Sequence, residues 1–454
     1  MSYPNVAPLS PDLQALQQSL QEQGVKYAMA SFVDLHGMCK GKVVPLNHFD
    51  RMMKGSELFT GAALEGVPQA INDDEVATMP DPDSATILPW NPEVAWFASD
   101  LYLSGQPFEA CCRTILKNVL KQAATMGYRF NLGIETEFFI FKETETGFGP
   151  VSDRDTLSKA CYALPTVLDN YKILDRIVSA MNGLGWDVYS FDHEDAQGQF
   201  ETDFAYCDAL KMADRLTFFR LMVKELAREQ GYFASFMPKP YAHQTGSGAH
   251  YNMSLADLET GQNLFEDPTD ACGLSKLGYQ FIAGILKHAQ AIVAVTCPTV
   301  NSYKRLVSRG SMSGFTWAPV YVCYGDNNRT NMLRIPHGGS RVECRAADIS
   351  TNLYLGAAMV LAAGLEGIRE GLDPGKPHTE NMYTYSLDEL KAMGIGTLPK
   401  TLGDAIAAFT ADPLSKTVMG PLMYQTYADF KVQEWEEYHC HVSDWEIQRY
   451  LKFF

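Results

Sequence analysis

The sequence predicts an α+β protein with a small N-terminal domain, residues 1–107, and a larger domain, residues 108–454. Three observations support this. The N-terminal part combines one helix with short strands and loops rich in glycine, proline and aspartate. The larger part alternates strands with long helices and contains no low-complexity segment or solenoid repeat. A chain of 454 residues, 46% of them hydrophobic, is long enough to bury a large core.

The elements of the N-terminal domain follow from local signals. A helix is expected over residues 10–23, because Ser10 is a favoured N-cap and Pro11 suits the first helical position. Two strands around a turn at His36 and Gly37 are expected next. Residues 55–95 are expected to form loops between short strands, and a helix over about 109–126 opens the larger domain.

Within the larger domain, strands are expected at 130–141, 233–240, 248–255 and 340–348, and helices at 167–184, 210–230, 274–296 and 353–371. The C-terminal segment 443–454 contains four aromatic residues, Trp445, Tyr450, Phe453 and Phe454. We therefore expect it either to pack on its own domain or to reach another subunit.

The charge balance excludes several classes of partner. The 37 basic and 54 acidic residues give a formal net charge of −17, which argues against nucleic acid and anionic membranes as partners. Every apolar stretch is shorter than the roughly 20 residues of a membrane span. The N-terminus lacks the features of a signal peptide, and the ten cysteines form no C-x-x-C motif. These features favour a cytoplasmic protein.

Two segments place carboxylates close together. In the strand expected at 130–141, Glu135 and Glu137 share a face with two phenylalanines. The two carboxylates would repel each other, and a divalent cation between them would remove that repulsion. The alternative is an exposed strand end. Glu194 and Glu201 flank a turn at Gly198 and could converge, although a solvated acidic turn is the other interpretation.

Two further segments supply nitrogen donors. His250, Asn252 and Ser254 form the polar face of a strand after a Gly-Ser-Gly loop, where a structural histidine is the alternative. Arg341, Glu343 and Arg345 also share a face, and Lys304, Arg305, Arg329 and Arg334 lie upstream. These bases form either a salt-bridge ladder or a clamp for phosphates and carboxylates.

Taken together, the four segments offer five glutamates and one histidine, a set that suits Mg²⁺ with phosphate groups better than zinc. No P-loop, G-x-G-x-x-G, G-x-S-x-G or H-E-x-x-H motif occurs. Any metal or nucleotide site must therefore be built from dispersed residues.

The order of these segments resembles the glutamine synthetase family, most closely its γ-glutamylmethylamide synthetase (type III) branch. The resemblance is carried by GIETEFFIF, HEDAQGQFE, FMPKP, TGSGAHYNMSL, NSYKRL, NRTNMLRIP and RVECRAAD, and runs through nearly the whole chain. It implies a β-grasp N-terminal domain and a catalytic domain with a curved antiparallel sheet. It also implies a homo-oligomer, usually a dodecamer of two hexameric rings, with active sites between subunits.

The resemblance also implies the roles of individual residues. One divalent metal, Mg²⁺ or Mn²⁺, is expected on Glu137, Glu194 and Glu201, and a second on Glu135, His250 and Glu343. Glutamate is expected at Gly246, Arg305 and Arg345. The residues expected to contact ATP or its phosphates are Asn252, Ser254, Arg329, Arg334 and Arg345.

In the reaction that the family implies, the glutamate γ-carboxylate attacks the γ-phosphate of ATP and forms γ-glutamyl phosphate. An amine then displaces the phosphate. The metals and arginines would neutralise charge on the transferred phosphoryl group. Tyr162 matches a tyrosine near the ammonium site of the family.

Two carboxylates that serve the amine in the family are missing. A Phe-Asp-Gly stretch is replaced by Phe59-Thr60-Gly61, and Trp317 precedes Ala318-Pro319 where a glutamate is expected. Thr245 and Asn252 replace a family asparagine and histidine. Because Trp317 could hold an alkylammonium by cation–π attraction, the sequence predicts methylamine as the nucleophile. A divergent glutamine synthetase that uses ammonia is the alternative.

Other possibilities stay open. Tyr383 lies where some family members are adenylylated, but the residues after it depart from that pattern. Two other classes remain: a metal hydrolase that uses the same carboxylates, and a relative that has lost catalysis.

Overall fold

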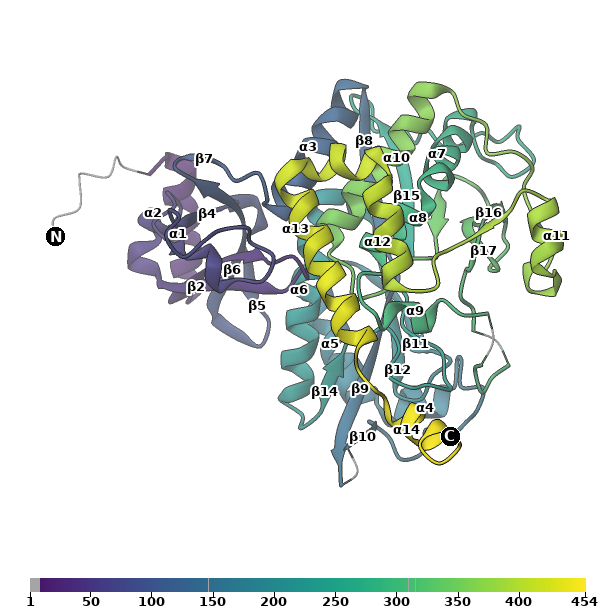
Figure 1. The fold of residues 1–454 in the computed structure, drawn as a ribbon. Helices are drawn as coiled ribbons and strands as arrows, with labels where there is room; N and C mark the ends of the chain where they lie inside the picture. Colours follow the sequence, from purple (N-terminus) through teal and green to yellow (C-terminus); the bar gives the residue numbers. More distant parts are fainter. Residues whose placement is uncertain (1–8, 146, 309, 315) are drawn as a thin grey trace.

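The computed structural model describes residues 9–145, 147–308, 310–314 and 316–454 (Figure 1). The first eight residues, part of the N-terminal segment expected to lack a signal peptide, lie outside this part, as do Arg309 and Phe315 of the segment before Ala318-Pro319. In the described part, no helix has the length and apolar character needed to cross a membrane.

An N-terminal sheet is formed by β1 (Tyr27–Val33), β2 (Cys39–Pro45), β3 (Leu58–Phe59), β4 (Val76–Pro80), β5 (Thr86–Leu88), β6 (Asn91–Leu103) and β7 (Gln106–Pro107). β1 and β6 pair in parallel, whereas the other pairs are antiparallel. α1 (Pro11–Glu22) and α2 (Phe49–Met52) share a small core with this sheet. Ser10 caps α1 by accepting a hydrogen bond from the Leu13 amide, as predicted. The arrangement fits the expected β-grasp.

The larger part of the chain contains two further sheets. One has the order β10-β9-β12-β11, with β14 paired to β9; its strands are β9 (Thr136–Thr144), β10 (Gly147–Pro150), β11 (Val188–His193), β12 (Gln199–Phe204) and β14 (Phe233–Ser235). The other has the order β13-β8-β15-β18-β17-β16-β19; its strands are β8 (Tyr128–Ile134), β13 (Cys207–Asp208), β15 (Tyr251–Asp257), β16 (Tyr321–Asp326), β17 (Asn331–Ile335), β18 (Val342–Cys344) and β19 (Gly396–Thr397). All pairs are antiparallel except β16 with β17.

The strand expected at 130–141 is wrong in one respect, because it divides at Glu135 into β8 and β9, which belong to different sheets. At the break, the Glu135 amide donates a hydrogen bond to the His250 carbonyl oxygen. The strands expected at 233–240 and 340–348 are also shorter than predicted.

Helices pack against the seven-stranded sheet that contains β8 and β15. They include α3 (Cys112–Thr125), α6 (Ala209–Arg228), α7 (Lys276–Lys287) and α10 (Leu353–Glu370). α10 is buried along most of its length and contacts both α3 and α7. Two predicted helices are each broken once, into α4 (Leu164–Asp169) and α5 (Tyr171–Gly183), and into α7 and α8 (Ala289–Thr296). The second break falls at His288, whose ring lies between Asp412 and Glu366.

The remaining helices are α9 (Ser302–Arg305), α11 (Leu387–Ala392), α12 (Leu402–Ala411), α13 (Pro413–His439) and α14 (Asp444–Tyr450). No residue of α14 is buried, and Phe453 and Phe454 after it are exposed. In the single chain, the C-terminal segment therefore does not bury its aromatic residues in its own domain, which was the first of the two alternatives.

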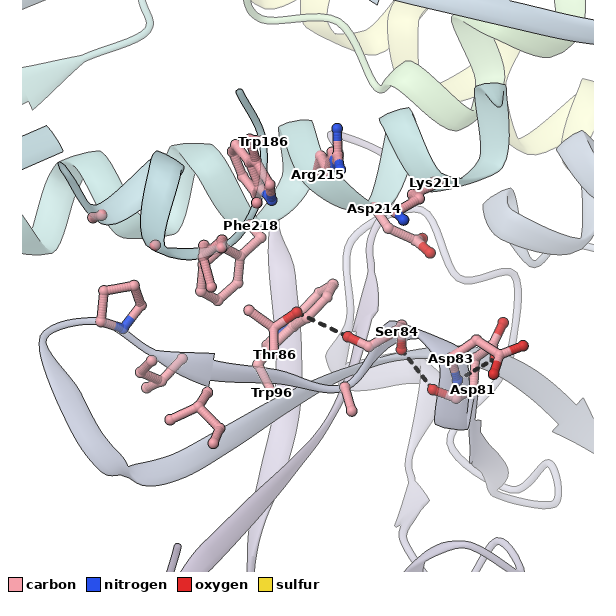
Figure 2. A pocket seen from close by; sticks show the side chains of 18 of the residues that line it. Asp81, Asp83, Ser84, Thr86, Trp96, Trp186, Lys211, Asp214, Arg215 and Phe218 are labelled. Carbon is pink, nitrogen blue, oxygen red and sulfur yellow. Dashed lines mark hydrogen bonds between the residues drawn. The ribbon is translucent and has the colours of Figure 1, made fainter. Parts of the chain in front are cut away.

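A buried ion cluster joins the N-terminal sheet to the helices. Arg113 of α3 donates hydrogen bonds to Asp214 of α6, to Asp100 of β6 and to Asp81. Figure 2 shows the adjoining cavity of about 1050 Å³, where Trp96 of the sheet faces Phe218 of α6. None of the predicted site residues lines this cavity.

Candidate active site

The predicted metal ligands and most of the arginines come together where the two sheets of the larger part of the chain meet. The β8–β9 break, the β11–β12 turn and the start of β15 supply acids and a histidine, while β17, β18 and the segment after β18 supply arginines and Glu343. In Figure 1 these elements lie in the large part of the chain, away from the N-terminal sheet.

The first predicted metal group converges. Glu137, Glu194 and Glu201 each place a carboxylate oxygen within 4.8 Å of the others. Glu137 of β9 and Glu201 of β12 are direct cross-strand neighbours, and Glu194 enters from the turn that Gly198 closes with a φ of 75°. Burial, and then the charges of Glu194 and Glu137, raise the pKa of Glu201 well above its usual range. Burial also raises the pKa of Glu194 and of Glu137.

The second predicted metal group also converges, with ligand atoms of Glu135, His250 and Glu343 within 4.8 Å of one another. His250 Nδ1 lies 2.6 Å from Glu135 Oε2 and 3.6 Å from Glu343 Oε1. Glu135 lies at the break between β8 and β9, which was not predicted from the sequence. At this position its carboxylate contacts His250.

The donor set of both groups fits hard divalent cations, because five of its six members are carboxylates. Within the described residues, Glu194 and Glu201 have no arginine, lysine or histidine at ion-pair distance. Half-buried carboxylates without a counter-charge carry a desolvation cost, and a cation between them would offset that cost.

Two site residues were missed by the sequence reasoning. Gln199 is fully buried and its Nε2 lies 3.2 Å from Glu137 Oε2 and 3.2 Å from the Gly246 carbonyl oxygen. Gly248 donates its amide hydrogen to Glu137 Oε2 at 2.7 Å. The sequence did contain a signal for Gln199, because it lies two residues before Glu201 and therefore on the same face of β12.

A side chain at Gly248 would displace neighbouring side chains. A Cβ at this position would lie 2.7 Å from Arg305 Nη2 and 2.8 Å from His250 Nε2. Gly246, predicted to contact glutamate, is equally confined, because a Cβ there would lie 2.2 Å from the Pro238 carbonyl oxygen. The Gly-Ser-Gly loop thus lies against the metal groups and Arg305.

The arginines surround Glu343. Arg345 Nη1 and Arg334 Nη1 donate to its two oxygens at 2.5 and 2.6 Å. The buried Nε of Arg345 has no hydrogen-bond partner among the described residues, which leaves a donor for an anionic ligand. Arg305 is buried and donates to the carbonyl oxygens of Ala346 and Arg345.

The residues predicted to contact ATP are spread more widely. Asn252 bridges Glu135 and Arg341, donating to the first and accepting from the second at 3.0 Å each. It therefore touches a predicted metal ligand rather than open space. Ser254 follows on the same face of β15, and Arg329 is exposed. The roles in nucleotide binding stay predictions.

Tyr162 and Trp317, predicted for the amine, share an unusual backbone. Their φ angles are 63° and 54°, in the left-handed region that bulky residues rarely occupy and that costs about 1–3 kcal/mol each. Both side chains are substantially exposed. Tyr162 lies close enough to Glu194 and Arg329 for their charges to act on the pKa of its hydroxyl, which burial raises.

Tyr383 is not presented for modification. Its hydroxyl donates a 2.6 Å hydrogen bond to the carbonyl oxygen of Ala318, the residue after Trp317, and burial raises its pKa to about 12. The structure thus adds a physical reason to doubt adenylylation at this residue.

Comparison with known proteins gives consistent matches. The profile of a family described as glutamine synthetase, catalytic domain, matches residues 109–450. A glutamate–methylamine ligase of Methyloversatilis universalis is 43% identical over 441 residues, which cover 96% of this chain and 99% of that protein. A glutamine synthetase of Rhizobium meliloti is 40% identical over 432 residues, covering 95% and 98%. A solved structure described as a GmaS/ADP complex, conformation 1, superposes with a TM-score of 0.90 at 39% identity, covering 96% of this chain and 99% of that one.

Proposed function

The chain belongs to the glutamine synthetase family, and on this premise we propose that it is an ATP-dependent ligase that joins the γ-carboxylate of glutamate to methylamine. The observation that carries the choice of amine is Trp317, an exposed aromatic residue at the position where the family has a carboxylate, in a loop that contacts Asp195 and Tyr383. The likeness to a glutamate–methylamine ligase over almost the whole chain supports it.

The arginines of the site suit the first half of the reaction. Arg345, with its free Nε, and Arg305 lie beside the Gly-Ser-Gly loop, where they are placed to hold the carboxylates of glutamate. Arg334 and Arg329 lie on the side of β17 and are placed to face phosphate oxygens. Guanidinium groups bind both kinds of anion in a bidentate manner. The γ-carboxylate would attack the γ-phosphorus and release ADP.

Two divalent cations, Mg²⁺ or Mn²⁺, would be held by Glu137, Glu194 and Glu201 and by Glu135, His250 and Glu343. Bound there, they would supply positive charge next to the phosphates. Gln199 and Gly248 hold Glu137 Oε2 in place by hydrogen bonds, and Asn252 holds Glu135 Oε1, so these two ligand positions are fixed by the chain itself.

The amine would approach between Tyr162 and Trp317. The ring of a tryptophan attracts a methylammonium ion through its π-face and contacts the methyl group, which an ammonium ion lacks. The nearby carboxylate of Glu194 would favour the cation, and deprotonation would give the nucleophile. Attack on the acyl carbon forms the amide bond and releases phosphate.

One observation favours the alternative, a glutamine synthetase that uses ammonia. Thr60, which replaces the family aspartate, has its hydroxyl 3.5 Å from Oε1 of Glu75. Both residues are exposed, so a carboxylate is available next to the position where one was thought to be missing. Glu75 could serve the amine in the aspartate's place.

We further propose a homo-oligomer, a dodecamer of two hexameric rings, with the N-terminal domain (1–107) of one subunit reaching the catalytic domain (108–454) of the next. The exposed aromatic residues of α14 and the C-terminus support contacts between subunits, because apolar surface of this kind is usually covered. A cytoplasmic location is proposed from the ten free cysteines, which suit a reducing compartment. Light scattering on a size-exclusion column measures the subunit number.

The function is tested by assaying phosphate release with glutamate, ATP and Mg²⁺ and identifying the amide by mass spectrometry. We expect release to depend on both glutamate and amine, with γ-glutamylmethylamide as product. A metal hydrolase would consume substrate without glutamate-dependent ATP use, and a relative without catalysis would show no turnover.

A further inference from the structure

The loop that carries Trp317, defined here as residues 311–314 and 316–319, is tied to the rest of the site at both ends. Near its start, the Ser313 hydroxyl donates a 2.6 Å hydrogen bond to Asp195 Oδ2, and the Met312 amide donates to the His243 carbonyl oxygen. Near its end, the Tyr383 hydroxyl donates to the Ala318 carbonyl oxygen at 2.6 Å. Trp317 therefore lies between two side-chain anchors.

Each anchor leads to a different part of the site. The amide of Asp195 donates to the carboxylate of Glu194, so the residue that holds Ser313 also orients a predicted metal ligand. Burial raises the pKa of the Tyr383 hydroxyl, and Arg345 and Arg305 lie close enough for their charges to oppose this rise. The loop thus spans from the acidic side of the site to the arginine side.

The anchors are themselves firmly held. Asp195 and Ser313 are both buried. Tyr383 packs on a small cluster that includes Tyr321 and Met382, and the Met382 amide donates to the Thr330 hydroxyl. The left-handed backbone of Trp317 is costly for a bulky residue, and the contacts of the loop on both sides of it restrain that conformation.

We propose that Tyr383 and Ser313 are positioning residues that hold the Trp317 loop across the amine side of the site, so that γ-glutamyl phosphate meets the amine rather than water. This inference rests on the proposed ligase function. If water attacks the acyl carbon instead, glutamate and phosphate are released and the net reaction is hydrolysis of ATP to ADP and phosphate. Neither residue needs to touch the substrates to have this effect.

The test compares Tyr383→Phe, which keeps the ring and removes the hydroxyl, with Tyr385→Phe as control. Tyr385 packs on the same cluster and donates no hydrogen bond to the loop. For Tyr383→Phe we expect the KM for methylamine to rise about threefold to tenfold, the effect of one lost hydrogen bond. The KM values for glutamate and ATP should stay within twofold, and more phosphate should be released per amide formed.

A second pair of variants keeps the proposal testable if Tyr383→Phe does not fold. Ser313→Ala removes the other anchor and should give the same pattern, whereas Ser313→Thr keeps a hydroxyl and should restore coupling. The proposal is overturned if folded Tyr383→Phe and Ser313→Ala match the parent enzyme in methylamine KM and in phosphate released per amide. A parent enzyme that forms no amide would instead overturn the proposed function.

Discussion

Glu137 and Glu201 face each other as cross-strand neighbours on β9 and β12, two like charges in a pair that is largely buried. Like charges opposite each other destabilise a sheet, and burial adds to the penalty. The carboxylate of Glu194 lies in the same group and increases the repulsion. Protonation or a bound cation would relieve this repulsion.

The metal dependence of stability follows from this arrangement. Burial and neighbouring acids raise the pKa of Asp192 and Asp203 to about 6, and that of Glu201 well above its usual range. At a pH between the pKa of such a carboxyl group in the unfolded chain and its higher pKa in the folded protein, the folded state binds more protons than the unfolded state. Metal-free stability should therefore fall as the pH rises from about 5 to 7.

Added Mg²⁺ should reverse this trend, because it binds the deprotonated carboxylates. Thermal unfolding at pH 5.5 and 7.5, with EDTA or with Mg²⁺, measures both effects. We expect a larger rise in Tm from Mg²⁺ at pH 7.5. Glu201→Gln should raise the Tm of the metal-free protein and weaken the response to Mg²⁺, while Glu143→Gln, an exposed change on β9, should do neither. An equal Mg²⁺ effect at both pH values would contradict the assignment.

Gly248 is predicted to tolerate no side chain. In Gly248→Ala the new Cβ meets Arg305, His250 and Glu137 within 3.0 Å, so at least one of these groups must move. A displacement of about 1 Å at a reacting centre can reduce kcat/KM by roughly a hundredfold. Gly183→Ala is the control, since it has open space and an ordinary backbone. Activity of Gly248→Ala within twofold of the parent would show that the loop does not border the site.

Trp317 is predicted to set the preference for methylamine. Replacing it by leucine removes the π-face, which is worth about 0.5–2 kcal/mol, so kcat/KM for methylamine should fall by roughly twofold to thirtyfold. The kcat/KM for ammonia should change less, because an ammonium ion makes no methyl contact. Steady-state kinetics with both amines measure the ratio. Val320→Leu, near the loop, serves as control, and an unchanged ratio in Trp317→Leu would remove Trp317 from the amine site.

Glu75 distinguishes the two candidate functions. If it replaces the family aspartate, Glu75→Gln should lower kcat/KM for ammonia and for methylamine by about tenfold or more, as expected for loss of a general base. If Trp317 alone serves the amine, the change should be within twofold. Glu57→Gln, on a neighbouring segment of the N-terminal sheet, controls for a general change of charge. The kinetics are measured on the full-length protein, and the number of subunits is checked for each variant.

Much of the fold and most of the site were accessible from sequence. Strand alternation correctly grouped His250 with Asn252, since both side chains contact Glu135, although β15 begins only at Tyr251. The break at Glu135 was not predicted, since apolar residues continue on both sides of it and only the contact with His250 reveals it. Local patterns do not report a change of sheet.

The contacts of the Trp317 loop were also beyond local reasoning. Tyr383 lies 65 residues from Ala318, and Ser313 lies 118 residues from Asp195. Family resemblance drew attention to Tyr383 for a different reason, modification, whereas the structure places its hydroxyl against the loop. Long-range hydrogen bonds of this kind depend on the whole tertiary fold.

The central claim is the choice of amine, and a competition experiment tests it most directly. The enzyme is supplied with glutamate, ATP and Mg²⁺ and with equal concentrations of methylamine and ammonia, both below their KM. Mass spectrometry then measures the initial ratio of γ-glutamylmethylamide to glutamine, which equals the ratio of the two kcat/KM values. We predict a ratio well above one; a ratio below one would identify ammonia as the preferred nucleophile and contradict the proposed function.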